Sequence, residues 1–203
     1  MSLMKSWIYI GLCALGGLAG CAGKQASPGP SETEGNASGD VTRPGKRPGE
    51  KVRELDLNRD GKTDVWIYLV SGKGPDGQER DRMVRKEIDV NADGRVDITQ
   101  FFDEQEEKVR EAMDQDFDGR IDSTLTFEKG INTLTERDVD GNGQVDVWVY
   151  YENGKLVRKE RDTNGDGKVD NWEYWKGDQV DRIGDDLDGD GKVDRWTKNP
   201  NAD

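Results

Sequence analysis

The chain repeats a unit of 24 residues, and this repeat constrains its fold more than any other feature. One copy runs from Arg137 to Glu160 and reads RDVDGNGQVDVWVYYENGKLVRKE. It contains a cluster of acidic and amide side chains, an aromatic run, an Asn-Gly pair and a charged run. A chain built from such units is expected to form an array in which each unit packs against its neighbours.

Six acidic segments follow one nine-residue template, D-x-[DN]-x-[DN]-G-x-[apolar]-D, with Thr63 as the single exception at the apolar position. We number them loops 1 to 6, at residues 56–64, 89–97, 114–122, 138–146, 162–170 and 186–194. Such residues also populate ordinary turns that hold no ion. Six copies that keep positions 1, 3, 5, 6 and 9 favour bound cations, because crowded carboxylates repel one another without a compensating charge.

The spacing of these residues fits Ca²⁺, a hard cation that takes about six to eight oxygen ligands. We expect side-chain oxygens from positions 1, 3, 5 and 9, and the backbone carbonyl of position 7, which Gly at position 6 turns inward. The candidate metal ligands are Asp56, Asn58, Asp60, Lys62, Asp64, Asp89, Asn91, Asp93, Arg95, Asp97, Asp114, Asp116, Asp118, Arg120, Asp122, Asp138, Asp140, Asn142, Gln144, Asp146, Asp162, Asn164, Asp166, Lys168, Asp170, Asp186, Asp188, Asp190, Lys192 and Asp194.

The loops resemble the first nine positions of an EF-hand loop, and equally the calcium loops of thrombospondin type 3, dockerin and FG-GAP repeats. An EF-hand carries a bidentate Glu at position 12, and among the six copies only Glu173 fits. This departure predicts that water or a neighbouring loop completes most sites, with modest affinities of about 10⁻⁴–10⁻³ M. Loop 4 is expected to be among the weaker sites, because Gly141 alters the glycine pattern and Asn142 replaces a carboxylate.

The segments that follow the loops predict β-strands, since they are β-branched and aromatic with a period of two, as in residues 146–151. Aromatic residues recur at two positions that share one strand face, and we expect this stripe to form a common core. Binding of sugars by an exposed stripe is the alternative. The stripe comprises Trp66, Tyr68, Phe101, Trp148, Tyr150, Trp172, Tyr174 and Trp196, with Thr99, Thr124, Thr126 and Lys198 at the remaining places.

A turn and a charged return strand complete each unit, as in Asn153-Gly154 followed by residues 156–160. Arginines share one register position in four of the return strands: Arg85, Arg110, Arg158 and Arg182. A solvated face with Glu/Arg pairs is the favoured interpretation, and stacking of each Arg on a neighbouring ring is the alternative.

The predicted fold is therefore all-β: a repeat array of antiparallel β-hairpins, about 24 residues each, joined by calcium-binding loops over residues 51–203. Residues 71–78 lengthen the first hairpin and are a candidate protruding loop, and the half-repeat that ends at Trp196 is a candidate cap. The pattern leaves open whether the array is an open meander or closes like a propeller.

The N-terminal residues predict export and a lipid anchor. Residues 1–20 combine Lys5, an apolar run and small residues, as in a secretory signal peptide. Leu18-Ala19-Gly20-Cys21 resembles the lipobox of bacterial lipoproteins, which implies cleavage before Cys21 and its acylation. Ala22 rather than Asp follows, so the outer membrane is favoured over the inner. Residues 21–50 are rich in Gly, Pro and Ser and are expected to be a disordered tether.

Composition excludes several function classes. The net charge of −13 argues against nucleic acid as a partner, and the absence of His removes the commonest catalytic base and zinc ligand. Hydrophobic residues make up only 32% of the chain, so cations are expected to replace part of a core. The sequence predicts a non-enzymatic, calcium-binding envelope lipoprotein with a structural or adhesive role. The alternative is a module that binds a polysaccharide or an envelope protein through the aromatic strands or residues 71–78.

Overall fold

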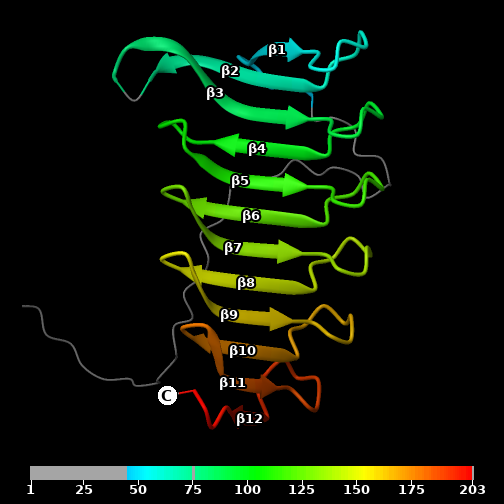
Figure 1. Ribbon diagram of the computed structural model, residues 1–203, viewed down its shortest axis with the longest axis vertical. Coiled ribbons are helices and arrows are strands. Elements are labelled where there is room, and N and C mark those ends of the chain that lie inside the picture. The colour runs from blue at the N-terminus through cyan, green and yellow to red at the C-terminus, as the bar shows by residue number, and fades with distance from the viewer. Residues whose placement is uncertain (1–44, 75, 203) are drawn as a thin grey trace, which may run out of the picture. The chain divides into compact units, whose positions relative to one another are not determined.

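A computed structural model describes residues 45–74 and 76–202, which form a single antiparallel β-sheet (Figure 1). The prediction of an all-β array of hairpins is confirmed. The strands in chain order are β1 (Lys51–Leu55), β2 (Val65–Lys73), β3 (Glu79–Ile88), β4 (Ile98–Phe102), β5 (Lys108–Met113), β6 (Ser123–Glu128), β7 (Ile131–Arg137), β8 (Val147–Glu152), β9 (Lys155–Arg161), β10 (Asn171–Lys176), β11 (Gln179–Asp185) and β12 (Arg195–Lys198). Each strand pairs with its neighbours in sequence, so the sheet is an open meander with β1 and β12 at its two ends.

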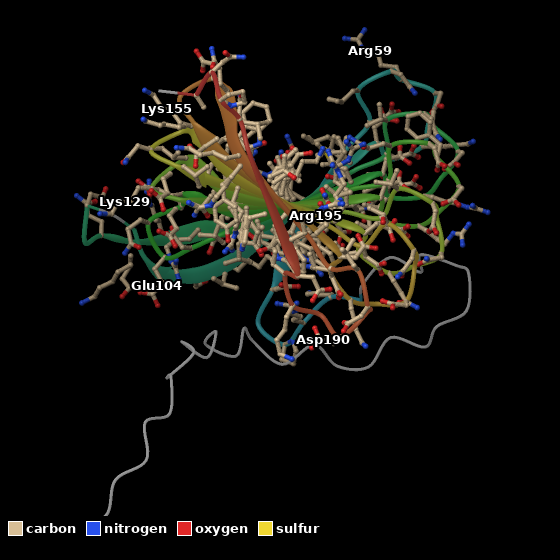
Figure 2. All side chains as sticks on the ribbon, turned by 90° about the horizontal axis from the view of Figure 1, so that it is seen from below. Arg59, Glu104, Lys129, Lys155, Asp190 and Arg195 are labelled. Carbon is tan, nitrogen blue, oxygen red and sulfur yellow. The ribbon has the colours of Figure 1, made fainter. Side chains whose placement is uncertain are left out.

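The acidic loops lie along one side of this sheet and the hairpin turns along the other (Figure 1). This separation follows from the repeat, because every loop follows an odd-numbered strand and every turn follows an even-numbered one. The strands rotate about the long axis, so that loop residues such as Arg59 and Asp190 point in different directions (Figure 2). Such rotation is the normal twist of a β-sheet, accumulated over many strands.

A ladder of backbone hydrogen bonds connects successive loops at their bases. The first Asp of each loop donates its N–H to the carbonyl of the last Asp of the preceding loop, at 2.8–2.9 Å. The five donor and acceptor pairs are Asp89 and Asp64, Asp114 and Asp97, Asp138 and Asp122, Asp162 and Asp146, and Asp186 and Asp170. The ladder holds consecutive loops in one register.

A β-bulge interrupts every hairpin at the same place, one residue before the shared arginine position. In the first hairpin Tyr68 pairs with Arg85 and Leu69 with Met83, which leaves Val84 unmatched. The equivalent unmatched residues are Val109, Thr133, Val157 and Asp181. A bulge increases local twist, so its repetition contributes to the rotation of the sheet. The alternating pattern of the sequence contains no signal for it.

Residues 71–78 do not form the predicted protruding loop as a whole. Ser71, Gly72 and Lys73 belong to β2 and pair with Asp81, Arg80 and Glu79 of β3. The insertion lengthens the ladder, because these residues continue the strand register, and β2–β3 extends beyond the other hairpins (Figure 1).

The predicted aromatic core forms only at the N-terminal end of the sheet. Trp66 and Tyr68 are 7% and 1% exposed and pack with Val96, and Val52 and Val84 join them. Trp148 and Trp172 are half-buried, and Trp196 is 51% exposed. The rest of the stripe stays partly exposed because the described residues supply no second sheet or helix to cover it.

Stacking of the arginines on neighbouring rings, the alternative interpretation, is observed, and the expected Glu/Arg pairs occur beside it at Arg85 and Arg158. The guanidinium carbon of Arg85 lies 3.8 Å from the centroid of the Tyr68 ring. Corresponding distances are 4.0 Å for Arg158 on Tyr150, 4.6 Å for Arg182 on Tyr174 and 6.0 Å for Arg110 on Phe101. The cause is the register, which places each arginine directly opposite the aromatic residue.

Candidate metal-binding loops

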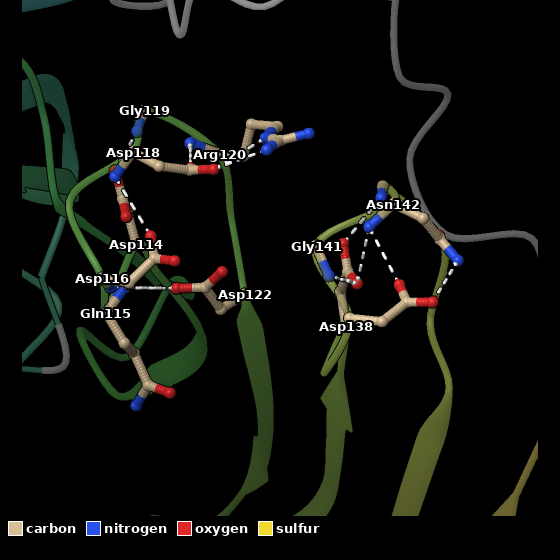
Figure 3. A network of polar contacts seen from close by, with 12 residues as sticks. Asp114, Gln115, Asp116, Asp118, Gly119, Arg120, Asp122, Asp138, Gly141 and Asn142 are labelled. Carbon is tan, nitrogen blue, oxygen red and sulfur yellow. Dashed lines mark hydrogen bonds and ion pairs between the residues drawn. The ribbon is translucent and has the colours of Figure 1, made fainter. Parts of the chain in front are cut away.

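The first and last Asp of each loop organise its backbone. In loop 3 the Gly119 N–H donates to Oδ2 of Asp114 at 2.7 Å, and the Gln115 and Asp116 N–H groups donate to Oδ2 of Asp122 (Figure 3). The N–H of position 6 donates to position 1 in all six loops. The N–H of position 2 donates to position 9 in all six as well. The repeat thus specifies one loop conformation six times.

Positions 3 and 5 form consecutive side-chain turns inside this frame. In loop 3 Oδ1 of Asp116 accepts from the Asp118 N–H, and Oδ1 of Asp118 accepts from the Arg120 N–H at 2.8 Å. The short Asp or Asn side chain can reach the backbone two residues further on, which is why these residue types favour such turns. The same hydrogen bonds occur in the other five loops.

Positions 1, 3 and 9 bring their carboxylates together. In three loops one oxygen from each carboxylate lies within 4.8 Å of the others, and such a group could hold a metal ion. The three groups are Asp114, Asp116 and Asp122; Asp138, Asp140 and Asp146; and Asp186, Asp188 and Asp194. Loops 1, 2 and 5 have Asn58, Asn91 and Asn164 at position 3, so an amide oxygen replaces the middle carboxylate.

Position 5 is not part of these groups, although the sequence analysis included it among the ligands. In loops 3 and 6 its carboxylate pairs with the basic residue of position 7, at 2.6 Å for Asp118 with Arg120 and for Asp190 with Lys192. The backbone carbonyls of position 7 stay predicted ligands.

Buried carboxylate oxygens provide an independent sign that these loops suit a cation. Oδ1 of Asp89, Asp114 and Asp170 is buried without a hydrogen-bond partner. Asp89 is 7% exposed and Asp114 is 3% exposed. An ionised carboxylate only accepts hydrogen bonds, and burying it unpaired is costly. A cation in the loop would offset this cost directly.

Equivalent first positions differ in electrostatics along the array. Burial raises the pKa of Asp114, and the nearby Asp122 and Asp118 charges add to this, against the hydrogen bond from Gly119. At Asp186 burial acts in the same direction, but N–H donors led by Gly191 and Gly189 outweigh it, and the pKa falls. Without a cation, the ionised form of Asp114 is therefore less favoured than the ionised form of Asp186.

Acidification is expected to release a cation from loop 3 before it releases one from loop 6. The raised pKa of Asp114 means that this group takes up a proton at a higher pH than Asp186, and a proton competes with a cation. In the cation-free protein, acidification is expected to raise the contribution of Asp114 to the free energy of unfolding. Ionised Asp114 disfavours folding at neutral pH, and this penalty disappears as pH falls through its folded-state pKa. NMR titration of the two carboxyl carbons, with and without Ca²⁺, measures both effects. Equal titration midpoints would contradict the prediction.

Position 4 adopts a left-handed backbone in every loop, which the sequence analysis missed. Its φ is 74–78° at Gly141, Gly165 and Gly189, and 62–64° at Arg59, Ala92 and Phe117. Gly141 fits this backbone without strain, because the conformation requires a residue that tolerates positive φ. The weaker affinity expected of loop 4 stays a prediction. The detectable signal was the recurrence of Gly at position 4 in loops 4 to 6.

Exchanging residues at position 4 is expected to change stability in opposite directions. Ala92→Gly should raise the free energy of unfolding and Gly165→Ala should lower it, each by about 1 kcal/mol, since an L-residue at this φ is strained. Neither site has a neighbour that would clash: nothing lies within 4 Å of a Cβ built on Gly165. Urea unfolding of the two variants measures the difference, and changes of the same sign would contradict it.

The side chain at position 7 reaches the next loop in loops 2 and 5. The Lys168 ammonium donates to the Gly189 carbonyl of loop 6 at 2.8 Å, and Arg95 lies against Gly119 of loop 3. Basic residues occupy position 7 in five loops, which was the available signal: Lys62, Arg95, Arg120, Lys168 and Lys192. These side chains place positive charge between neighbouring acidic loops.

The predicted signal peptide, Cys21 and most of the tether lie outside the described residues. Within residues 45–74 and 76–202, the structure contains no helix with the length and apolarity needed to cross a membrane.

Comparison with known proteins adds no family. No protein-family model and no curated protein matches the chain. Among solved structures, it is similar to one described as accessory secretory protein 1,2 and 3 in Streptococcus pneumoniae, with 14% identity and a TM-score of 0.34. The match covers 64% of this chain and 19% of that chain, so this chain spans less than a fifth of the length of the protein it matches.

Proposed function

We propose that the six loops bind Ca²⁺ and that the bound ions stabilise a single-layer β-sheet displayed on a bacterial envelope. The observation that carries the proposal is the grouping of carboxylate oxygens from positions 1, 3 and 9 on one repeated hydrogen-bond frame. Hard oxygen ligands without nitrogen or sulfur favour Ca²⁺ over transition metals. The protein has no catalytic role in this proposal.

Stabilisation by ions suits a sheet of this kind. Only six hydrophobic side chains in the described part of the chain are buried, so packing contributes less than in a layered domain. An ion that binds only the folded loops adds free energy by mass action. It also offsets repulsion between loops that the backbone ladder holds side by side.

Asp114→Asn and Asp186→Asn form a matched test of ion binding. Each variant should lose one calcium site, because position 1 belongs to the oxygen group in both loops. Without calcium, Asp114→Asn should cost less stability than Asp186→Asn, since burial disfavours the Asp114 anion while hydrogen bonds favour the Asp186 anion. Calorimetric calcium titration gives the site count and urea unfolding gives stability. Unchanged stoichiometry in both variants would refute binding at these loops.

Attachment to the membrane is proposed through Cys21, with the outer membrane as the destination because Ala22 follows. Residues 21–50 would then act as a tether between the lipid and the sheet. Metabolic palmitate labelling should mark the protein and disappear in Cys21→Ser. Membrane fractionation should move Ala22→Asp toward the inner membrane. Unlabelled wild-type protein would exclude the anchor.

A second candidate function is binding of a polysaccharide or an envelope protein. Tyr150, Tyr151, Tyr174 and Arg158 line a hollow of about 330 Å³ on the strand surface, and aromatic rings stack readily on sugars. Titration with soluble cell-wall glycan fragments, followed by tyrosine and tryptophan fluorescence, tests this function. Tyr174→Ala removes a ring from the hollow, whereas Tyr68→Phe changes only the buried core. Loss of glycan binding in the first variant alone would assign binding to the hollow.

A further inference from the structure

We propose that copies of this chain associate head to tail, with the outer edge of β12 in one copy pairing with the outer edge of β1 in the next. The inference concerns the strand edges and does not require an ion in the loops. It follows from the way the meander begins and ends within the repeat.

The two ends of the sheet are complementary halves of one hairpin. Every complete hairpin consists of an even-numbered aromatic strand followed by an odd-numbered return strand. Within residues 45–74 and 76–202, β1 is a return strand without an aromatic strand before it, and β12 is an aromatic strand without a return strand after it. In Figure 1 they lie at opposite ends of the sheet. A second copy, stacked by continuing the array, places β1 antiparallel to β12, as the alternation of strand directions requires.

The backbone register of this pairing can be derived from the hydrogen bonds at β12. The Asn199 N–H donates to the Asp181 carbonyl at 2.8 Å, so by alternation Thr197 and Arg195 bond to β11. The N–H and C=O groups of Trp196 and Lys198 therefore point to the outer edge. The equivalent residue Trp66 faces Glu87 of its return strand, and Trp148 faces Glu160. By the same register, Trp196 would face Glu54 and Lys198 would face Val52 of the second copy.

Side chains at the two edges fit this register. Trp196 is 51% exposed, and all four residues of β12 are exposed. Lys198 would lie diagonal to Glu54 of the second copy on the same face, within reach of an ion pair. Arg195 would lie diagonal to Arg53, but Arg195 already pairs with Asp185 at 2.9 Å. Lysine on an edge strand normally discourages pairing, because its charge would be buried without a partner. Here Glu54 of the second copy would supply the opposite charge.

The loop side of the sheet would continue across the junction as well. The ladder of backbone bonds ends at Asp194. In the other loops the carbonyl of the last Asp accepts a hydrogen bond from the N–H of the next loop's first Asp. Asp56 of the second copy occupies that place in the continued array. Translation of one copy onto the next is a heterologous contact, which forms open chains instead of closed pairs.

The association should be weak in solution, because an interface of one short strand pair falls below about 1,200 Å², the range of transient contacts. Confinement on a membrane raises the effective concentration and would lengthen the chains. We therefore expect monomers in dilute solution. Chains should lengthen as the protein concentration approaches about 1 mM, since small interfaces make transient contacts.

Two edge variants test the pairing. Sedimentation of the full chain in density-matched detergent, with and without Ca²⁺, should show growth for wild type. Lys198→Pro removes an outward N–H of β12, and Glu54→Pro removes one of β1. Each variant alone should stay monomeric, because every copy then lacks one of the two edges that must pair. Their equimolar mixture should form one-to-one dimers, because it combines one intact β12 edge with one intact β1 edge. Lys198→Ala and Glu54→Ala are the controls and keep the donors.

The outcomes separate the alternatives. Wild type that stays monomeric up to about 1 mM in both buffers would overturn the proposal, since even transient interfaces associate in this range. Growth that both proline variants retain would also overturn it. Circular dichroism verifies that the variants fold. If either does not, charge reversal replaces it: Lys198→Glu and Glu54→Lys should each weaken association several-fold, and the double variant should restore it. If the double variant does not restore association, this register is excluded. Calcium binding by the monomer is tested separately by calorimetry, so either result stands without the other.

Discussion

Replacing Arg85 with alanine is expected to lower the free energy of unfolding by about 3–5 kcal/mol, the range for removing one partner of a buried ion pair. Arg85 is 1% exposed and lies between Glu50 and Glu87, at 3.2 and 3.4 Å. Its guanidinium also covers the Tyr68 ring, whose hydroxyl donates to Glu87 at 2.8 Å. The substitution leaves two buried carboxylates without their cation. Urea unfolding followed by tryptophan fluorescence measures the loss.

Arg182→Ala is the matched control, because Arg182 occupies the same register and stacks on Tyr174 but has a side chain that is 48% exposed. Its loss should cost less than about 1 kcal/mol, as for exposed ion pairs. Glu87→Gln in the Arg85→Ala background should recover part of the stability by removing a buried charge. Equal losses at the two arginines would show that stacking, and not the buried charge network, sets the energy.

Removal of calcium is expected to have the largest effect on the sheet. At a free Ca²⁺ concentration of about a hundred times its Kd, one site contributes about 2.7 kcal/mol to the free energy of unfolding, so three such sites contribute about 8 kcal/mol. That sum is comparable to the whole stability of an ordinary domain, about 5–15 kcal/mol. A chelator should therefore lower the melting temperature strongly or unfold the sheet. Circular dichroism of the β signal and tryptophan fluorescence follow the change.

The control for chelation is a magnesium exchange. Mg²⁺ demands a near-ideal octahedral shell and dehydrates reluctantly, so an excess of Mg²⁺ should restore less of the melting temperature than Ca²⁺ does. A shift that any divalent ion or simple salt restores equally would indicate charge screening instead of specific sites. Unchanged spectra and melting temperature after chelation would remove calcium from the account of stability.

The sequence predicted the antiparallel hairpins and the joining of acidic loops to them, because both depend on local, repeated chemistry, but it left open whether the array closes. The alternation around residues 146–151 and the Asn153-Gly154 turn specify a hairpin, and short connections leave only antiparallel pairing. Asp at positions 1 and 9 was recognised as ligand-forming, and the structure brings these positions together with position 3. Position 5 stays a predicted ligand, and in loop 3 its carboxylate pairs with Arg120 at position 7, a neighbour that the loop template treats as variable.

Features that depend on register between strands were not predictable in the same way. The bulge at Val84 shifts the register between β2 and β3 so that Arg85 lies opposite Tyr68. No residue type in the sequence predicts this bulge. Burial of the aromatic stripe also differs between Trp66 and Trp196, although the residues are equivalent in the repeat. Their environments differ because Glu50 and the N-terminal strand cover one end of the sheet, whereas β12 has only one neighbour.

Calorimetric titration of the calcium-free chain with Ca²⁺ at neutral pH tests directly whether the loops bind the ion. We expect more than one site per chain, with affinities of about 10⁻⁴–10⁻³ M as for extracellular modules. We also expect that Asp114→Asn and Asp186→Asn each remove one site. Absence of binding heat up to about ten times that concentration range, with no change in melting temperature, would contradict the account.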